Sequence, residues 1–316
     1  MTQRLRLGRA SVARVVELRF SLGTTAFPRT PASVWPDNAD LLVPDFFDPD
    51  TDQLHIAIQS WVIRVDGLTV VVDTGVGNDR LRPHMPPLDH LDTAFLSALE
   101  SAGIDRGAVD VVVNTHLHSD HVGWNTMLDN GAWVPTFPNA RYLLPAADYR
   151  HFEPDGPAAR ATPRTAGEAA QQRGDQLVFA DSVLPIDAAG QLIRWSDDYR
   201  ISDSLRLRPA AGHTPGSSVL WLDAGQPSVF VGDLTHSPLQ LRRPGEACAF
   251  DVDADAAAQT RRRIFTEAAQ AKAAVIPAHY PGRGGATIRA VEDRFDVDQW
   301  LDTGSLPTPS GTPPQR

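Results

Sequence analysis

The alternation of apolar and polar residues predicts a chain in which strands and helices follow one another. Residues 55–65 alternate in part, residues 68–72 form a short apolar run, and the intervening Asp66 and Gly67 are a strong β-hairpin signal. Apolar residues at helical spacing predict a helix over 92–102. The same criteria predict further strands over 109–113, 141–144, 205–209, 217–223, 228–231 and 274–276, and further helices over 146–152, 165–183, 255–271 and within 287–300. The pattern therefore indicates a mixed α/β sandwich.

The two ends of the chain lack this periodicity. The opening stretch becomes rich in Pro and Asp, and we expect it to form an irregular N-terminal arm over about residues 1–50. Residues 302–316 are rich in Pro, Gly, Ser and Thr, a composition typical of a disordered tail. No shift in composition marks a boundary between the two ends, so we expect a single domain over 1–301.

Composition and charge disfavour one class of partner. Of the 316 residues, 42% are hydrophobic and 22% are charged, which is enough to build a core without cross-links. The net charge is -10, whereas nonspecific binding to a phosphate backbone needs basic clusters, so we expect no nucleic-acid partner. One basic run, Arg261-Arg262-Arg263, falls in an alanine-rich predicted helix, where we expect a solvated face.

Cysteine content and apolar run length indicate the compartment. Cys248 is the single cysteine and has no partner for an intramolecular disulfide, which fits a reducing environment. The first 20 residues contain no continuous apolar segment of the kind that secretory signals have. No stretch is long and apolar enough to cross a bilayer. We therefore expect a cytoplasmic protein with no membrane partner.

A dense group of metal-ligand side chains follows the strand predicted over 109–113. The segment Thr-His-Leu-His-Ser-Asp-His places His116, His118, Asp120 and His121 within six residues at the end of a strand. Imidazole and carboxylate groups are good ligands for zinc and related divalent ions. A chance polar loop of this kind is improbable in a chain with ten histidines. We therefore expect these residues to bind metal, and one short loop could serve two ions.

Three further candidates lie just past predicted strands. They are His213 in AGHTPGS, Asp233 in VFVGD and His279 in VIPAHY. Taken singly, a Gly-Asp pair is usually a turn, and a lone His after a strand is usually a surface or capping residue. Functional sites gather where the strands of open α/β sheets end, so the shared position favours one metal site with the first group.

The HLHSDH motif, with the three later residues in order behind it, resembles the ligand set of the metallo-β-lactamase superfamily. The Asp73-Thr74-Gly75 turn matches this family as well, and the resemblance covers roughly residues 60–279. It implies a four-layer αββα sandwich and two divalent ions per chain, zinc first, with manganese, iron or cobalt also suited to His and Asp ligands. It also makes Asp73 a residue that supports ligands rather than a ligand. The resemblance assigns one ion to His116, His118 and His213, the other to Asp120, His121 and His279, and both to Asp233.

Within this superfamily the chain resembles N-acyl-homoserine lactonases and methyl parathion hydrolase-like enzymes, through residues 121–125 (HVGWN) and 232–236 (GDLTH). Some lactonases place a tyrosine against the substrate carbonyl, and no position here matches it. The chain offers His236 instead, as the parathion hydrolase-like members do; this histidine either acts in the site or fixes a neighbouring loop. Trp124 either lines the site or packs in the core. We expect the arm's aromatic residues, Trp35, Phe46 and Phe47, to pack the arm onto the sandwich.

We therefore predict a dinuclear metal-dependent hydrolase with a lactone or carboxylic ester as its small-molecule substrate. In this hypothesis a metal-bridging hydroxide attacks the carbonyl carbon, and Asp120 or His236 protonates the leaving alkoxide. Cys248 is expected to be inert, since no serine or cysteine nucleophile is needed. Two alternatives stay open: a phosphotriester or thioester hydrolase on the same centre, and a non-catalytic metal-binding protein. The residues leave open whether the protein forms a homodimer.

Overall fold

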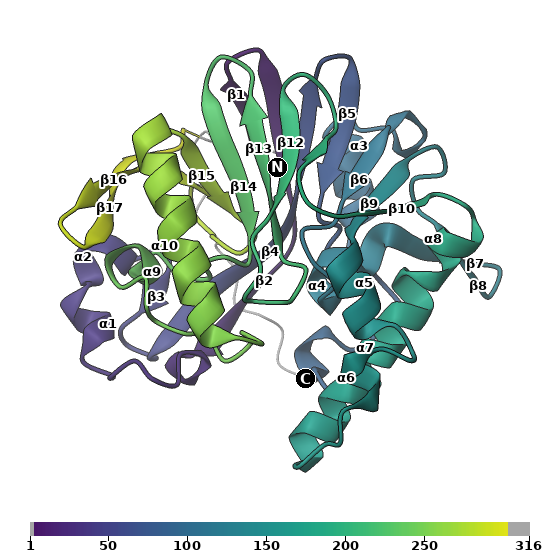
Figure 1. Cartoon of the computed structure of the whole chain (residues 1–316), viewed down its shortest axis with the longest axis horizontal. Helices are drawn as coiled ribbons and strands as arrows, with labels where there is room; N and C mark the ends of the chain where they lie inside the picture. The colour runs from purple at the N-terminus through teal and green to yellow at the C-terminus, as the bar shows by residue number, and fades with distance from the viewer. Residues whose placement is uncertain (1–2, 303–316) are drawn as a thin grey trace.

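The computed structural model describes residues 3–302 and has two large β-sheets at its centre (Figure 1). The predicted disordered tail falls almost wholly on residues 303–316, outside the described part. One sheet has eight strands, β1 (Gln3–Leu7), β2 (Ala10–Gly23), β3 (Phe47–Asp48), β4 (Gln53–Val65), β5 (Leu68–Val72), β6 (Val111–Val113), β9 (Arg141–Pro145) and β10 (Leu192–Trp195). The other has seven, β11 (Tyr199–Arg200), β12 (Leu205–Pro209), β13 (Ser218–Asp223), β14 (Pro227–Gly232), β15 (Ala274–Pro277), β16 (Ala286–Val291) and β17 (Arg294–Trp300). A separate hairpin pairs β7 (Thr126–Asp129) with β8 (Ala132–Pro135).

Helices cover the outer faces of both sheets, with α3, α5 and α8 on one side and α10 on the other, while α6 packs on α5 and α7 beyond the first sheet (Figure 1). Their bounds are α1 (Val34–Asp37), α2 (Ala39–Leu42), α3 (Phe95–Ser101), α4 (Ser119–Val122), α5 (Ala146–Phe152), α6 (Pro157–Arg160), α7 (Ala166–Ser182), α8 (Leu184–Ala188), α9 (Leu239–Arg242) and α10 (Ala254–Ala271). Short 3-10 turns occur at η1 (Thr24–Ala26), η2 (Pro86–Leu88), η3 (Arg106–Ala108) and η4 (Gly123–Asn125).

The core lies in three layers between these elements. Inward-facing residues of the two sheets, such as Val72 and Phe230, form one buried cluster. The outer face of the first sheet packs against α3 through Leu99, and the outer face of the second packs against α10 through Phe265. Successive side chains of a strand point to opposite faces, and apolar residues on both faces let each sheet pack on the other sheet with one face and on helices with the other. The four-layer αββα prediction is confirmed.

Most predicted elements are present within one or two residues of their expected bounds. The hairpin signal is confirmed: β4 pairs antiparallel with β5, and Asp66 and Gly67 have φ values of 52° and 77°. Positive φ at both central residues defines the type I′ turn that this dipeptide favours.

Two expectations were wrong. The opening stretch is not irregular throughout, because β1 and β2 together occupy most of its first 23 residues. Strand β1 pairs with β2, and β2 pairs with β4. The helix expected within 287–300 is instead the antiparallel hairpin of β16 and β17. Strand β1 alternates strictly between buried and exposed residues, a two-residue period that marks a half-buried strand even in so short a segment.

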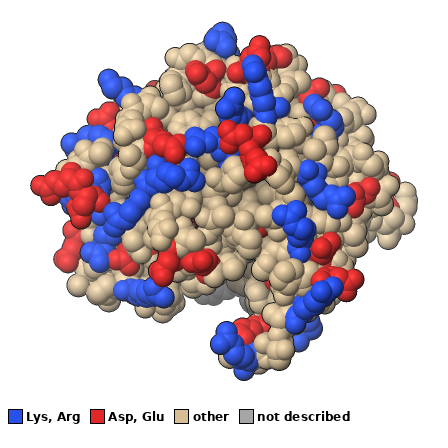
Figure 2. Space-filling view, viewed as in Figure 1, with Lys and Arg blue, Asp and Glu red and all other residues tan. Residues whose placement is uncertain are grey.

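The charged side chains differ from expectation at one position of the basic run. Acidic and basic side chains intermingle on the face shown in Figure 2, and no helix in residues 3–302 is long and apolar enough to cross a membrane. However, the basic run of α10 is not wholly solvated, because Arg261 is completely buried. Its guanidinium donates to three backbone carbonyls, those of Leu234, Pro244 and Glu246, which explains how a cation is accommodated there.

The fold brings the ends of several strands to one place. Strands β5, β6, β9 and β10 run parallel, as do β14 and β15, so their carboxyl ends lie at one edge of each sheet. The loops that carry the predicted ligands follow β6, β12, β14 and β15 directly. This edge is where open α/β sheets bind ligands.

Candidate metal centre

One group of donors is formed by His116, His118, His213 and Asp233. Their ligand atoms all lie within 4.8 Å of one another. The Nδ1 atom of His118 is 3.1 Å from His116 Nε2 and 3.0 Å from His213 Nε2. Asp233 Oδ2 is 3.2 Å from His213 Nε2 and 3.7 Å from His116 Nε2. Three imidazole nitrogens and a carboxylate oxygen therefore converge on one point, as zinc ligands do.

A second group of donors is formed by Asp120, His121 and His279, which also lie within 4.8 Å of one another. Asp120 Oδ2 is 3.4 Å from His279 Nε2 and 3.7 Å from His121 Nε2. The other oxygen of Asp233, Oδ1, faces this group at 3.0 Å from His279 Nε2 and 3.2 Å from His121 Nε2. Each oxygen of Asp233 thus faces a different group.

The donor atoms fit a shared cation better than they fit one another. Within the described residues, His121 Nε2 and Asp233 Oδ1 are both buried and have no hydrogen-bond partner, although they lie only 3.2 Å apart. Buried polar atoms are almost always hydrogen-bonded, so two orphaned atoms that face each other off-axis require an explanation. A divalent ion coordinated by both would satisfy them.

Contacts on the far side of the imidazole rings decide which nitrogen points inward. The Nδ1 atoms of three histidines are held from outside: His121 by Asp73 Oδ2 at 2.9 Å, His213 by Asp251 Oδ1 at 3.0 Å, and His279 by the Ala57 carbonyl at 3.0 Å. A carbonyl only accepts, so His279 Nδ1 carries a proton and leaves Nε2 free to ligate. Metal-bound histidines are oriented in this way by their outer partners.

The imidazole pKa values respond to burial and to the carboxylates. Burial lowers the pKa of His118 to about 3, with the neighbouring His213 acting in the same direction. Burial also lowers the pKa of His213, but Asp233 and Asp251 outweigh it and raise the value to about 9. For His121 the carboxylates of Asp233, Asp120 and Asp73 likewise outweigh burial and hold the pKa well above its ordinary value. The cluster therefore attracts positive charge, which protons or metal ions can supply.

His236 joins the centre as well. Its Nε2 lies 3.1 Å from Asp233 Oδ2, and its ring stacks on His279 with centroids 5.4 Å apart. Asp233, His236 and His279 form a third set of donors within 4.8 Å of one another. Burial lowers the pKa of His236, but Cys248 and Asp233 outweigh it and raise the value to about 9.

Asp148 ties two ligand loops together and was missed from the sequence. It is fully buried in α5 and accepts hydrogen bonds from Leu117 N, Thr214 Oγ1 and Gly216 N. These donors belong to the loops that carry His116, His118 and His213. A side chain at Gly216 would meet the Asp148 backbone at 2.5 Å, so only glycine fits there. Asp148 closely follows a strand, and the strand-end rule could have found it.

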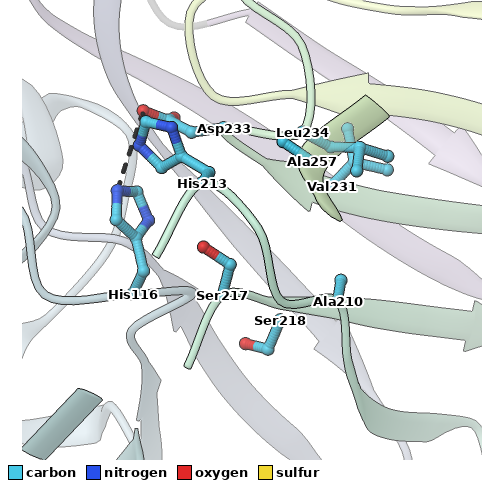
Figure 3. Close-up of a pocket in the computed structure, with 9 residues that line it drawn as sticks. All are labelled: His116, Ala210, His213, Ser217, Ser218, Val231, Asp233, Leu234 and Ala257. Carbon is cyan, nitrogen blue, oxygen red and sulfur yellow. Dashed lines mark ion pairs between the residues drawn. The ribbon is translucent and has the colours of Figure 1, made fainter. Parts of the chain in front are cut away.

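The centre is closed on one side and open on the other. Figure 3 shows His116, His213 and Asp233 beside a small hollow whose other lining residues, including Ala210, Val231 and Ala257, are buried. This hollow therefore lies on the core side of the ligands. His118 and Asp120 are the partly exposed members of the two groups, so the centre is open to solvent on their side.

The aromatic candidates lie in the core. The ring of Trp124 stacks on Phe95, and its Nε1 donates to Glu17 Oε1 at 2.6 Å, so it is not a wall of the site. The arm's aromatic residues, Trp35, Phe46 and Phe47, pack in a cluster with Tyr280 and the buried Cys248.

Comparisons with known proteins agree with this architecture. The model of the metallo-beta-lactamase superfamily matches residues 56–280. The solved hydrolase AbOPH, of the beta-lactamase superfamily, is similar with a TM-score of 0.76, 22% identity, and coverage of 95% of this chain and 96% of that chain. AidC, a dizinc quorum-quenching lactonase solved with a product, has a TM-score of 0.75, 20% identity, and coverage of 97% and 98%. A probable metal-dependent hydrolase from Staphylococcus aureus has a TM-score of 0.75, 15% identity, and coverage of 96% and 100%. At these identities the likeness concerns the fold.

Proposed function

The chain belongs to the metallo-beta-lactamase superfamily and is a metal-dependent hydrolase, and we propose that it cleaves a lactone or carboxylic ester at a dinuclear centre. The observation that carries this proposal is the position of Asp233, whose two oxygens face two separate groups of buried donors. A carboxylate in that position can bridge two ions.

The proposed ligands divide as the distances do. His116, His118 and His213 would hold one ion, and Asp120, His121 and His279 would hold the other, with Asp233 shared. All five histidines offer imidazole nitrogen donors and both aspartates offer hard oxygen donors, a mixture that suits zinc. Bound divalent ions would lower the pKa of water to about 7 and polarise a carbonyl oxygen.

Asp120 and His236 are the residues proposed to move protons. The Asp120 side chain is 18% exposed, against 5% for Asp233, so it is the carboxylate that substrate can reach. Its second oxygen is available to take a proton from the attacking water and return it to the leaving alkoxide. His236 lies beside the centre, with its Nε2 3.1 Å from Asp233 Oδ2, and is proposed to donate a proton to a substrate oxygen.

The surroundings support a substrate with an apolar part. The exposed ring of Phe250 lies 6.2 Å from His236, and the ring of Phe152 lies 6.0 Å from His118, as centroid distances. Two phenyl rings therefore lie close to histidines of the centre. The similarity to the lactonase AidC favours a lactone over other esters.

Metal analysis combined with a substrate panel tests this proposal. The purified protein is loaded with zinc or manganese, its metal content is measured, and hydrolysis of a lactone, an aryl ester, a thioester and a phosphotriester is assayed. Two ions per chain and turnover of the lactone or aryl ester are expected. Turnover of only the phosphotriester or thioester would replace the substrate assignment. Less than one ion per chain, or a metal-replete protein inert on every substrate, would overturn the function.

A further inference from the structure

The loop between α9 and α10 buries a carboxylate against one of the ligands. Asp251 Oδ1 lies 3.0 Å from His213 Nδ1, and its Oδ2 accepts a hydrogen bond from the Cys248 backbone N–H at 3.0 Å. The Asp251 side chain is completely buried. Both oxygens are therefore engaged, one with a ligand ring and one with its own loop.

This loop reverses the usual distribution of side chains. Phe250 is 43% exposed and Val252 is 55% exposed, whereas Asp251 between them is buried. Apolar burial cannot explain such an arrangement, because it would turn the loop the other way. The backbone is also fixed to the ligand segment, since Val252 N donates to the His213 carbonyl at 2.9 Å. The polar contacts of Asp251 with His213 and Cys248 therefore help to orient the loop.

Arg261 supplies the balancing charge. Its Nη2 atom is 3.8 Å from Asp251 Oδ2 and has no hydrogen-bond partner among residues 3–302, while its other nitrogens are bound to backbone carbonyls. One of those carbonyls belongs to Leu234, the residue after the bridging Asp233. A buried cation requires a nearby anion, and Asp251 is the carboxylate within 4 Å of this one in the described chain.

The other group of donors has a matching support. Asp73 Oδ2 lies 2.9 Å from His121 Nδ1, and the same carboxylate accepts hydrogen bonds from the Thr115 backbone N–H and hydroxyl. Each group of donors thus has one histidine whose Nδ1 contacts a buried carboxylate. Asp73 comes from a loop beside the first sheet and Asp251 from a loop beside the second.

We propose that Asp251 is a positioning residue that orients His213 and thereby supports the His116–His118–His213 group selectively. This inference rests on the proposed metal centre. It predicts that Asp251→Asn weakens binding of the ion at the His116–His118–His213 group by about 10- to 100-fold, the range for outer partners of metal-bound histidines, and leaves the affinity for the other ion unchanged. Asp73→Asn is expected to weaken binding of the ion at the Asp120–His121–His279 group.

The experiment uses the full-length zinc protein dialysed against a chelator, with metal content, competition titration and anomalous diffraction at the zinc edge as readouts. Asp251→Asn should retain one ion, at the Asp120–His121–His279 group, whereas Asp255→Asn, an exposed position in the first turn of α10, should retain both. Wild-type affinity for both ions in Asp251→Asn, or loss from the other group, would overturn the proposal. Equal weakening of both ions together with a lowered melting temperature would show a merely structural role and would also overturn it.

A second measurement, on cobalt-loaded protein, reports on the contact between Asp251 and His213 itself. The Nδ1 proton of His213 should give an exchangeable, paramagnetically shifted NMR signal in the wild type that is absent from Asp251→Ala or, should that variant not fold, from Asp251→Asn because of faster exchange. Persistence of every such signal would count against the proposal. Binding of two ions by a wild type that hydrolyses nothing would refute the proposed function but not this inference.

Discussion

The two sheets supply the candidate ligands in different ways. The first sheet presents four donors within one loop after β6, from His116 to His121, whereas the second presents His213, Asp233 and His279 after three separate strands. Their supports do not differ in sequence distance, since Asp73 is 48 residues from His121 and Asp251 is 38 residues from His213. They differ in place: Asp73 lies in the turn after β5, next to β6, whereas Asp251 lies in the loop between α9 and α10. Local chemistry is visible in a sequence, whereas chemistry assembled by topology becomes visible only in the fold.

The largest expected effect tests whether the two sheets contribute equally. His116→Ala and His213→Ala each remove a donor from the same group, so both should lower kcat/KM by well over the roughly 100-fold typical of an outer partner. Metal content and kcat/KM of the two variants, measured side by side, check this. Wild-type rates in either variant would exclude that residue as a ligand, and a large effect in His116→Ala alone would make the second sheet a scaffold only.

A stability difference within α10 comes next. Arg261→Met removes a buried cation that holds three carbonyls and faces Asp251, so it should lower the free energy of unfolding by about 3–5 kcal/mol. Arg262→Met, at the exposed neighbour, should change it by less than about 0.5 kcal/mol. Urea unfolding of the metal-free proteins measures both. Similar values for the two variants would show that the burial of Arg261 is energetically irrelevant.

This contrast shows why the basic run was misjudged. Three consecutive arginines in an alanine-rich helix predict a solvated face, and a helix does expose two of three consecutive positions in many orientations. Which position turns inward depends on what lies beneath, here the carbonyls of the segment after β14. The seven predicted ligands, by contrast, carry a sequence signal, which is the dense histidine motif, the ends of predicted strands and the family resemblance. Asp251 had no such signal, because it lies in a loop between two helices rather than just past a strand, and it belongs to none of the motifs recognised in the sequence.

Proton release should distinguish the donors at neutral pH. Burial keeps His118 neutral, with a pKa of about 3, whereas Asp233 and Asp251 raise the pKa of His213 to about 9 against the effect of burial. An ion must displace the proton of His213, so affinity should rise about tenfold per pH unit for each displaced proton between pH 7 and 9. Calorimetric titration with zinc in buffers of different ionisation enthalpy should detect at least one proton released at pH 7. A buffer-independent heat would contradict the prediction.

The same shift fixes the sign of the pH dependence of stability. The folded pKa of His213, about 9, lies above the unfolded value of about 6.5. Its contribution to the stability of the metal-free protein is therefore complete below pH 6.5 and is lost as the pH rises through 9. In the zinc-loaded protein this loss should disappear, because the ion has replaced the proton.

Two hairpin turns show the same difference between a feature that the sequence signals and one that it does not. The β4–β5 turn contains Gly67 at a φ of 77° and was read correctly from the sequence. The β16–β17 turn also has two residues, because Val291 pairs with Arg294, yet Glu292 occupies its positive-φ position at 55°. Glycine is the residue that usually signals such a turn in a sequence. Without it, no turn separates the two strands in the sequence pattern, and the segment resembles a helix.

The smallest expected effect comes from two substitutions that exchange the residue types of these turns. Gly67→Ala places a Cβ in the left-handed region, with open space around it, so it should lower the free energy of unfolding by about 1 kcal/mol through backbone strain alone. Glu292→Gly removes the same strain at an exposed position and, after the entropy that glycine adds to the unfolded chain, should raise it by about 0.5 kcal/mol. Urea unfolding resolves both signs, and unchanged zinc content serves as the control. Destabilisation by Glu292→Gly would mean that the glutamate side chain stabilises the turn by more than its backbone conformation costs.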